Sequence, residues 1–218
     1  MKIAGAIFDL DGTLLDSMGA WHDLGTDYLR GRGYVPPATI HQDLLRLSML
    51  QAAHYMKELG VRDDEQKIYD DMCAVIAAFY ESRVQAKPGA LALLQRLDAM
   101  GVKMCVATAT DRPLVEAGMR RAGMERYISR VFTCKELNTT KHEPLIFETA
   151  RGFLGTVPEE TWVFEDARHC AVTAVGAGLR VCGVYDPSEP DQDALKAASD
   201  VYVRTFEEAL AIFGGEEA

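Results

Sequence analysis

Hydrophobic and polar positions follow two different patterns along the chain. At the start, and again from about residue 88 onward, short apolar runs of strand length alternate with stretches of helical spacing. The apolar runs predict strands at residues 3–8, 103–107, 131–134, 161–164, 180–184 and 201–203. The helical patterns cover residues 90–100, 113–122, 144–154, 171–177 and 206–213. Strands that alternate with helices predict a parallel sheet covered by helices on both faces.

The segment between residues 16 and 87 has the helical pattern and no convincing strand. Helices are predicted there at residues 16–32, 38–47, 48–59 and 63–84. Ser17 is a favourable capping residue for the first of them. Because the first strand belongs to the sheet, the helical block is an insertion after it. The sequence therefore predicts an α/β fold, a doubly wound Rossmann-like sheet formed by residues 1–15 and 88–218, with an inserted all-helical domain at 16–87.

Composition narrows the range of partners. The 218 residues carry a formal charge of −10, which disfavours a nucleic-acid partner, because nucleic-acid phosphates bind Lys and Arg. No stretch of about 18 apolar residues is present, so we expect no membrane span, and the N-terminus lacks the features of a signal peptide. The five cysteines are scattered and mostly lie in apolar runs, which is typical of reduced, buried thiols. We expect a cytoplasmic monomer.

Candidate chemistry appears first at the end of the apolar run 3–8. The run leads directly into two carboxylates one residue apart, Asp9 and Asp11, followed by Gly12. Carboxylates this close repel each other unless a cation lies between them, and Mg²⁺ prefers hard oxygen ligands. Gly12 allows backbone N–H groups of the turn to approach an anion. An isolated Asp-x-Asp is usually an acidic turn, but its position after a buried strand favours a metal-assisted phosphate site.

Later strand ends carry complementary groups, and ligands bind at the carboxyl ends of parallel strands. Strand 103–107 ends at Thr108, Lys141 lies in the turn past the third strand, and strand 161–164 is followed by Glu165 and Asp166. Singly, these residues are more often a cap, a solvated lysine and the acidic start of a helix. Their joint occurrence in this order favours phosphoryl transfer.

Each group has a role in such a reaction. One carboxylate can attack phosphorus and form an aspartyl-phosphate, and a second can protonate the leaving alcohol and later deprotonate water. Thr108, nearby backbone N–H groups such as that of Ala109, and Lys141 can hold the phosphoryl oxygens. Mg²⁺ between Asp9 and Asp166 would neutralise both nucleophile and phosphate, so that two anions can meet.

In these motifs the chain resembles the haloacid dehalogenase superfamily of phosphatases and phosphotransferases. Over essentially its whole length it is similar to the subgroup with a helical cap inserted after the first motif, which includes β-phosphoglucomutase and phosphoglycolate phosphatase. The motifs are Asp9-Leu-Asp11-Gly12-Thr13, Thr108, Lys141 with Pro144 and Phe147, and Glu165-Asp166. The resemblance implies Asp9 as nucleophile and Asp11 as general acid and base. It also implies phosphate ligands at Gly12, Thr108, Ala109 and Lys141, and a Mg²⁺ site at Asp9, Asp11, Glu165 and Asp166.

The chain departs from the family pattern at two places. The Lys-Pro that begins the third motif of the family is Lys141-His142 here. After the acidic pair, many relatives have a Ser and, three residues further along, a Gly, where this chain has Ala167 and Cys170. Neither departure removes a group to which the resemblance assigns chemistry.

The residue two positions after the nucleophile separates the reactions of the family. Dehalogenases lack an acid there and phosphonate hydrolases usually have Ala, so Asp11 favours an oxygen leaving group and a phosphate ester. The expected function is hydrolysis of a small phosphorylated metabolite, such as a sugar phosphate, with Mg²⁺ as cofactor. Trp21 and Arg112 are candidate substrate contacts, although such aromatic residues are usually core and single arginines usually surface.

Two other functions stay open. A β-phosphoglucomutase-like phosphotransferase would carry a His in the first cap helix and an Arg in the next cap segment, where motif spacing places Trp21 and Met49. His22 lies one position away, so this alternative remains. A non-catalytic regulatory protein that binds Mg²⁺ and phosphate is the second alternative. A receiver domain is disfavoured, because it has its phosphorylated Asp on a different strand from the acidic pair.

Overall fold

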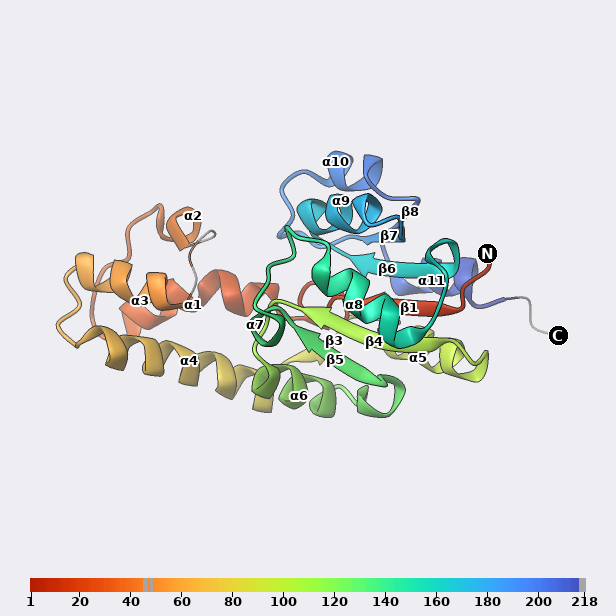
Figure 1. The fold of residues 1–218 in the computed structure, drawn as a ribbon. Coiled ribbons are helices and arrows are strands. Elements are labelled where there is room, and N and C mark those ends of the chain that lie inside the picture. The colour runs from red at the N-terminus through yellow and green to blue at the C-terminus, as the bar shows by residue number, and fades with distance from the viewer. Residues whose placement is uncertain (45–46, 48, 216–218) are drawn as a thin grey trace. The chain divides into compact units, whose positions relative to one another are not determined.

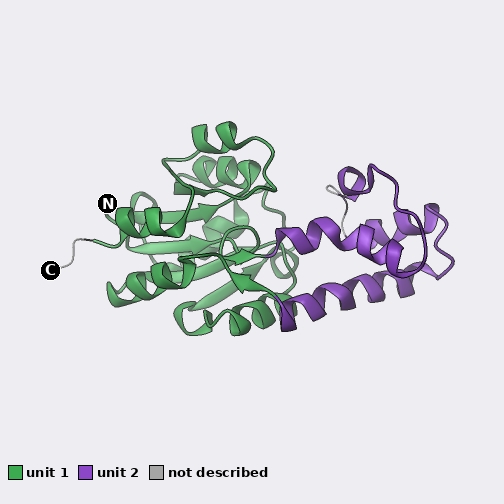
Figure 2. Ribbon diagram, turned by 180° about the vertical axis from the view of Figure 1, so that it is seen from behind, with its two compact units in different colours: residues 1–16, 84–218 green, residues 17–83 purple. Residues whose placement is uncertain are grey.

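The chain folds into two compact units. The computed structural model describes residues 1–44, 47 and 49–215. The larger unit comprises Met1–Asp16 and Val84–Ala218, and the helical unit comprises Ser17–Arg83 (Figure 2). The second boundary lies at Val84, before residue 88, because β3 (Gln85–Ala86) pairs antiparallel with β2 (Leu15–Asp16). The expectation of no strand in this region is therefore wrong at β3, which is too short to show a pattern.

The larger unit is built on a six-stranded parallel sheet with the order β5-β4-β1-β6-β7-β8. Its strands are β1 (Gly5–Phe8), β4 (Lys103–Thr108), β5 (Arg130–Thr133), β6 (Thr161–Glu165), β7 (Arg180–Val184) and β8 (Val201–Val203). From β1 the chain builds one half of the sheet through β4 and β5, and then returns past β1 to build the other half. The predicted doubly wound sheet is confirmed, and its switch point lies at β1.

Helices cover both faces of this sheet, so its strands are buried on both sides (Figure 1). The helices of one face are α8 (Leu145–Leu154), α9 (Arg168–Gly176) and α10 (Gln192–Ala197). Those of the other face are α5 (Ala90–Ala99), α6 (Arg112–Arg121) and α11 (Phe206–Phe213). Ile7 and Val163 from the sheet and Phe147 from α8 belong to one buried core cluster, which fixes α8 across the middle strands.

Short helices were not visible in the hydrophobic pattern. The sequence indicates no helix at α7 (Cys134–Leu137) or at α10, and each is started by a side-chain cap. Thr133 accepts a hydrogen bond from the Glu136 N–H, and Asp191 accepts one from the Ala194 N–H. Single turns of 3₁₀ helix occur at η1 (Glu125–Tyr127) and η2 (Pro158–Glu160). The strand predicted to end at Cys134 ends one residue earlier, because α7 begins there.

The helical unit contains α1 (Met18–Gly31), α2 (Ile40–Leu44), α3 (Met49–Glu58) and α4 (Glu65–Ser82). The helices predicted at 38–47 and 48–59 include residues 45, 46 and 48, which lie outside the described residues. Asp64 caps α4 by accepting the Lys67 N–H, whereas Ser17 precedes α1 without a capping hydrogen bond from its side chain. Within the described part of the chain, no helix has both the length and the apolar character needed to span a membrane.

Candidate active site

The site begins at the carboxyl end of β1, the strand at the switch point of the sheet. Phe8, the last residue of β1, is in register with Val106 of β4 and Phe164 of β6. The next residue, Asp9, donates its backbone N–H to the Phe164 carbonyl at 3.0 Å and has a side chain that is almost fully buried. The ends of β1, β4 and β6 therefore lie side by side, as ligand-binding sites of open α/β sheets require.

A tight turn follows Asp9. Gly12 has φ of 82°, a conformation that strongly favours glycine, and its N–H donates to the Leu15 carbonyl at 3.0 Å. Gly12 therefore shapes the turn, and its N–H is already used, which argues against the predicted role of this N–H in binding phosphate. The turn also directs the buried Thr13 hydroxyl to the Asp166 carboxylate, at 2.8 Å. Thr13 was not singled out by the sequence analysis, although it lies within the first motif.

Lys141 bridges the acid that follows β1 and the acid at the end of β6. Its Nζ contacts the carboxylates of Asp9 and Glu165, and all three side chains are buried. Burial lowers the pKa of the ammonium group, but the two carboxylates outweigh burial and raise the pKa of Lys141 well above its usual value. Lys141 is therefore a permanent positive charge, placed where a phosphoryl group bound at Asp9 would need one.

Three carboxylates form a buried group around this lysine. One oxygen each of Asp9, Glu165 and Asp166 lie within 4.8 Å of one another. Burial, together with the neighbouring carboxylates, raises the pKa of Asp9 to about 7 and the pKa of Asp166 well above its usual value. Three acids against one ammonium leave an excess of negative charge in a dry environment, and the donor set consists of hard oxygen atoms. The residues present therefore fit a divalent cation such as Mg²⁺.

Asp11 is held by a different set of hydrogen bonds. Its Oδ2 accepts a hydrogen bond from the Thr110 hydroxyl at 2.6 Å, and the Thr110 N–H donates to Thr108 Oγ1 at 3.1 Å. Thr108 is buried and Ala109 is exposed at the end of β4. Thr110, which the sequence analysis missed, thus connects the second carboxylate of the first motif to the hydroxyl of the second. Its proximity in sequence to Thr108 was the available signal.

The two candidate substrate residues are both engaged with protein groups. Arg112 donates through two nitrogens to the Glu136 carboxylate, one of them at 2.6 Å, and to the Val131 carbonyl at 3.0 Å. In the helical unit, Trp21 Nε1 donates to the Tyr80 hydroxyl at 3.0 Å, and the two rings meet edge to face. These contacts give Arg112 and Trp21 defined positions within their own units.

A buried ion pair near the acidic group was also missed. Asp186 follows β7 and is almost fully buried, with Lys87 Nζ 2.7 Å from its Oδ2. The N–H and hydroxyl of Ser188 donate to its other oxygen at 2.9 and 2.6 Å. The negative charge of Asp186 is one of the smaller contributions that raise the pKa of Asp166. The signal was its place just after the strand that the hydrophobic pattern predicts at residues 180–184.

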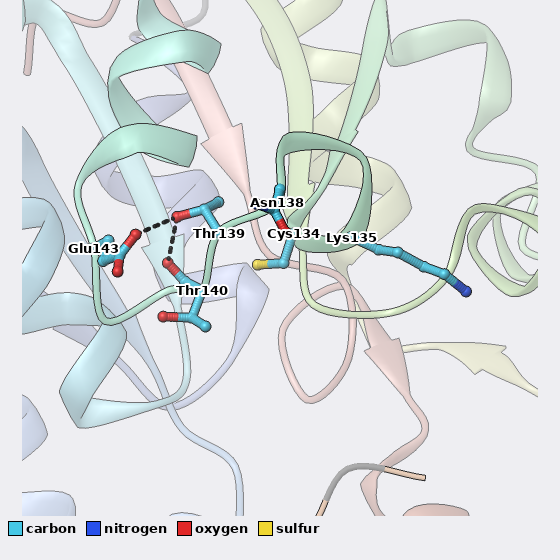
Figure 3. Close-up of a pocket in the computed structure, with 6 residues that line it drawn as sticks. All are labelled: Cys134, Lys135, Asn138, Thr139, Thr140 and Glu143. Carbon is cyan, nitrogen blue, oxygen red and sulfur yellow. Dashed lines mark hydrogen bonds between the residues drawn. The ribbon is translucent and has the colours of Figure 1, made fainter. Parts of the chain in front are cut away.

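The segment that leads to Lys141 forms a pocket of about 300 Å³ (Figure 3). The pocket is lined by Cys134, Lys135, Asn138, Thr139, Thr140 and Glu143. In Figure 3 the Thr139 side chain faces Glu143, and its hydroxyl donates to the Glu143 carboxylate at 2.9 Å. The thiol of Cys134 accepts the Lys141 backbone N–H, so the pocket shares a wall with the loop that presents the lysine.

Comparison with known proteins identifies the family. The fold and the site define an α/β protein with a buried acidic group at the carboxyl ends of its strands, and the model of the haloacid dehalogenase-like hydrolases matches residues 6–184. Phosphoglycolate phosphatase from Rhodobacter capsulatus is 33% identical over 180 residues, which cover 79% of this chain and 80% of that protein. Hexitol phosphatase A from Escherichia coli (strain K12) is 28% identical over 190 residues, 87% of this chain and 86% of that protein.

Solved structures agree with this result at the level of the fold. A candidate β-phosphoglucomutase from Thermotoga maritima superposes with a TM-score of 0.84 at 20% identity, covering 97% of this chain and 100% of that one. The chain belongs to the haloacid dehalogenase-like hydrolases. Since its named relatives are phosphatases of this family, it is a phosphoric monoester hydrolase.

Proposed function

We propose that this protein is a Mg²⁺-dependent phosphatase that hydrolyses a small phosphate monoester through an aspartyl-phosphate on Asp9. The observation that best supports the proposal is the contact of one buried ammonium group, that of Lys141, with both Asp9 and Glu165, beside Asp166. A structural ion pair needs one carboxylate for each lysine, and here there are three. The excess acid is understandable if a cation and a phosphate dianion complete the site.

The metal would be held by Asp9 and Asp166, with Glu165 completing the acidic group. Glu165 has one oxygen at Lys141 and accepts the Ala167 N–H at the other, at 3.2 Å, so its carboxylate is firmly oriented. Asp11 would face the site from the other side of the turn, where Thr110 holds it. When bound, Mg²⁺ supplies positive charge that keeps Asp9 ionised and lowers its repulsion for phosphate.

The reaction proceeds in two steps on the residues of the chain. In the first, a carboxylate oxygen of Asp9 forms a bond to phosphorus as the bond from phosphorus to the leaving oxygen breaks, and Asp11 gives that oxygen a proton. In the second, water attacks the aspartyl-phosphate, Asp11 takes a proton from the water, and inorganic phosphate leaves with Asp9 regenerated. Lys141, Thr108 and the backbone N–H of Ala109 hold the phosphoryl oxygens.

The substrate we propose is a sugar phosphate or another small phosphorylated metabolite, and the helical unit acts as the cap that selects it. The names of the two relatives, a phosphoglycolate phosphatase and a hexitol phosphatase, support a small monoester. Trp21, whose indole N–H donates to the Tyr80 hydroxyl within the helical unit, is the candidate of this unit for a substrate contact. Arg112 is a second candidate contact, although its pairing with Glu136 lowers its availability.

A panel of phosphate monoesters, assayed with Mg²⁺, tests the proposal. We expect the wild type to release phosphate from at least one ester, and Asp9→Asn to lower kcat by about 10³-fold or more, since the nucleophile is lost. Asp98→Asn, a change on the exposed surface of α5, is the matched control and should behave as the wild type. A chelator should abolish activity reversibly. Absence of phosphate release from every ester, or rapid interconversion of β-glucose 1-phosphate and glucose 6-phosphate without net hydrolysis, would contradict the proposal.

A further inference from the structure

Two histidines lie together close to Lys141 and its carboxylate partners. His142 follows Lys141 in the chain, and its ring stacks on that of His169, with the centroids 4.5 Å apart and the planes inclined by 26°. His169 lies in the first turn of α9, the helix that begins directly after Glu165 and Asp166. The stack therefore joins the loop that carries the lysine to the helix that follows the acidic pair.

The loop has a reason to need such a contact. A proline after the lysine, as in the family pattern, would restrict the backbone through its ring, whereas a histidine leaves the backbone free. The bonds within the loop are local: the His142 N–H donates to Thr140 Oγ1 at 3.3 Å, and the Thr139 hydroxyl donates to Glu143. The Lys141 side chain reaches Glu165 at the end of β6, but neither of these two bonds connects the loop to α9. The histidine stack makes that connection.

The surroundings of His169 favour a neutral stack. Burial, followed by the proximity of His142, lowers the pKa of His169, so the two imidazoles meet without a pair of positive charges. His169 Nε2 lies 3.2 Å from Cys170 Sγ, and Cys170 is buried in the same core cluster as Cys134. His142 and Cys170 are both positions where this chain departs from the family pattern, and both contact the ring of His169, His142 by stacking on it and Cys170 through Nε2.

We propose that His142 and His169 are positioning residues whose stacked rings hold the loop of Lys141 against α9, so that the ammonium group stays in place to receive a phosphoryl group. The expected effect on catalysis rests on the proposed phosphatase function, whereas the stacking contact itself does not. A stacked aromatic pair corresponds to a factor of about 2 to 12 in an equilibrium constant. An effect of this size should appear in phosphate affinity.

The test uses the full-length protein, inorganic phosphate as the probe and Mg²⁺ at saturation. The variants are His142→Ala, His142→Phe, His169→Ala and the double alanine variant, with Val172→Ala, an exposed position on α9, as the matched control. We expect each single alanine variant to weaken phosphate binding, measured by calorimetry, by about threefold to tenfold. The double variant should be no weaker than the singles, since one contact is lost in each. His142→Phe should bind as the wild type, because its ring can still stack.

Amide exchange and steady-state kinetics separate positioning from a general loss of stability. We expect faster exchange in residues 138–144 of the alanine variants, a raised KM with little change in kcat, and restoration of both by His142→Phe. Unchanged phosphate affinity in His142→Ala, additive effects of the two alanine changes, or a phenylalanine variant as weak as the alanine one would overturn the proposal. A wild type that binds phosphate but hydrolyses no ester would defeat the phosphatase and leave the positioning result standing. Conversely, a wild type that hydrolyses an ester, with phosphate affinity that does not change in His142→Ala, would defeat the positioning proposal and leave the phosphatase function standing.

Discussion

Two groups of charged residues, one buried and one exposed, show how burial changes the pKa of an aspartate that lies beside a lysine. In the larger unit, Lys141 meets Asp9 and Glu165 out of contact with water, and the pKa of Asp9 is raised to about 7, chiefly by burial. In the helical unit, the Asp71 carboxylate accepts a hydrogen bond from Lys67 Nζ at 2.8 Å near the surface. There the hydrogen bond from Lys67 lowers the pKa of Asp71.

This difference in burial separates a candidate binding site from an ion pair on the surface. An exposed carboxylate next to a lysine is stabilised by it, and water and salt screen the pair so strongly that it contributes little. A buried group with more acids than bases either keeps a proton or binds a cation. We therefore propose the acidic group of the larger unit as a binding site, whereas the pair on α4 belongs to a solvated helix face.

The largest difference is expected between the two lysines. We expect Lys141→Ala to lower kcat/KM for a phosphate ester by about 10²- to 10³-fold, because a preorganised charge facing the phosphoryl group is lost. Lys67→Ala should leave kcat/KM within about twofold of the wild type, because the Lys67 ammonium group pairs with Asp71 on the exposed face of its own helix. Circular dichroism at the assay temperature checks that both variants are folded. Equal losses in the two variants would show that the buried lysine has no special role.

The pH dependence of stability should differ in sign between the two groups. Because the pKa of Asp9 is raised from 3.8 to about 7, the metal-free folded protein retains a proton that the unfolded chain has released in this window. The free energy of unfolding should therefore fall as pH rises from about 4 to about 7, by at most about 4 kcal/mol from this group. The lowered pKa of Asp71 acts oppositely, and its contribution is lost as pH falls below the usual carboxyl range.

Urea unfolding with a chelator at about pH 5.5 and pH 8 measures this dependence. Mg²⁺ should restore stability, and it should do so more strongly at the higher pH, because the metal competes with the proton for the same carboxylates. The Asp9→Asn variant should lose most of the pH dependence. Stabilisation by Mg²⁺ that is the same at both pH values would count against a metal site made of these acids.

A smaller difference is expected between two threonines that each donate to an aspartate at 2.8 Å. Thr13 donates to Asp166 in the buried group, and Thr39 donates to Asp43 on the surface of the helical unit. We expect Thr13→Ala to weaken the apparent Mg²⁺ affinity about 10- to 100-fold, since the metal ligand loses its orienting hydrogen bond. Thr39→Ala should leave the affinity unchanged. The readout is the Mg²⁺ concentration that gives half-maximal activity.

The smallest effect is expected at Arg112. If the arginine acts mainly through its pairing with Glu136, Arg112→Ala and Glu136→Ala should each change KM by no more than about threefold and to a similar extent. A KM raised tenfold or more in Arg112→Ala alone would make Arg112 a substrate contact. Steady-state kinetics on one ester, with both variants in parallel, decides between these outcomes.

The fold was largely predictable from the sequence because its strands are buried on both faces. A strand such as β1 must be apolar at every position, and an abrupt change to Asp9 marks its end. The parallel sheet with helices on both faces followed from strands alternating with helices and is confirmed. The helices α7 and α10 were missed because their starts depend on single capping side chains, Thr133 and Asp191, and not on a periodic pattern.

The sequence predicts those residues of the site that lie at the ends of strands. The expectation that Lys141 lies near Asp9 followed from topology, since their elements meet at the same edge of the sheet. The hydrogen bond of Asp11 with Thr110 could not be predicted, because no local sequence pattern links the turn at Gly12 to the loop after β4. The pairing of Arg112 with Glu136 joins α6 to α7, and no local sequence pattern encodes that contact.

Covalent phosphorylation of Asp9 tests the central claim most directly. The wild type, mixed with a hydrolysed ester and Mg²⁺ and quenched in acid within one turnover, is digested and examined by mass spectrometry. We expect one phosphoryl group on the peptide that contains Asp9, sensitive to hydroxylamine and absent when a chelator is present. Steady turnover of the ester with no phosphoryl group on that peptide at any quench time would contradict the account.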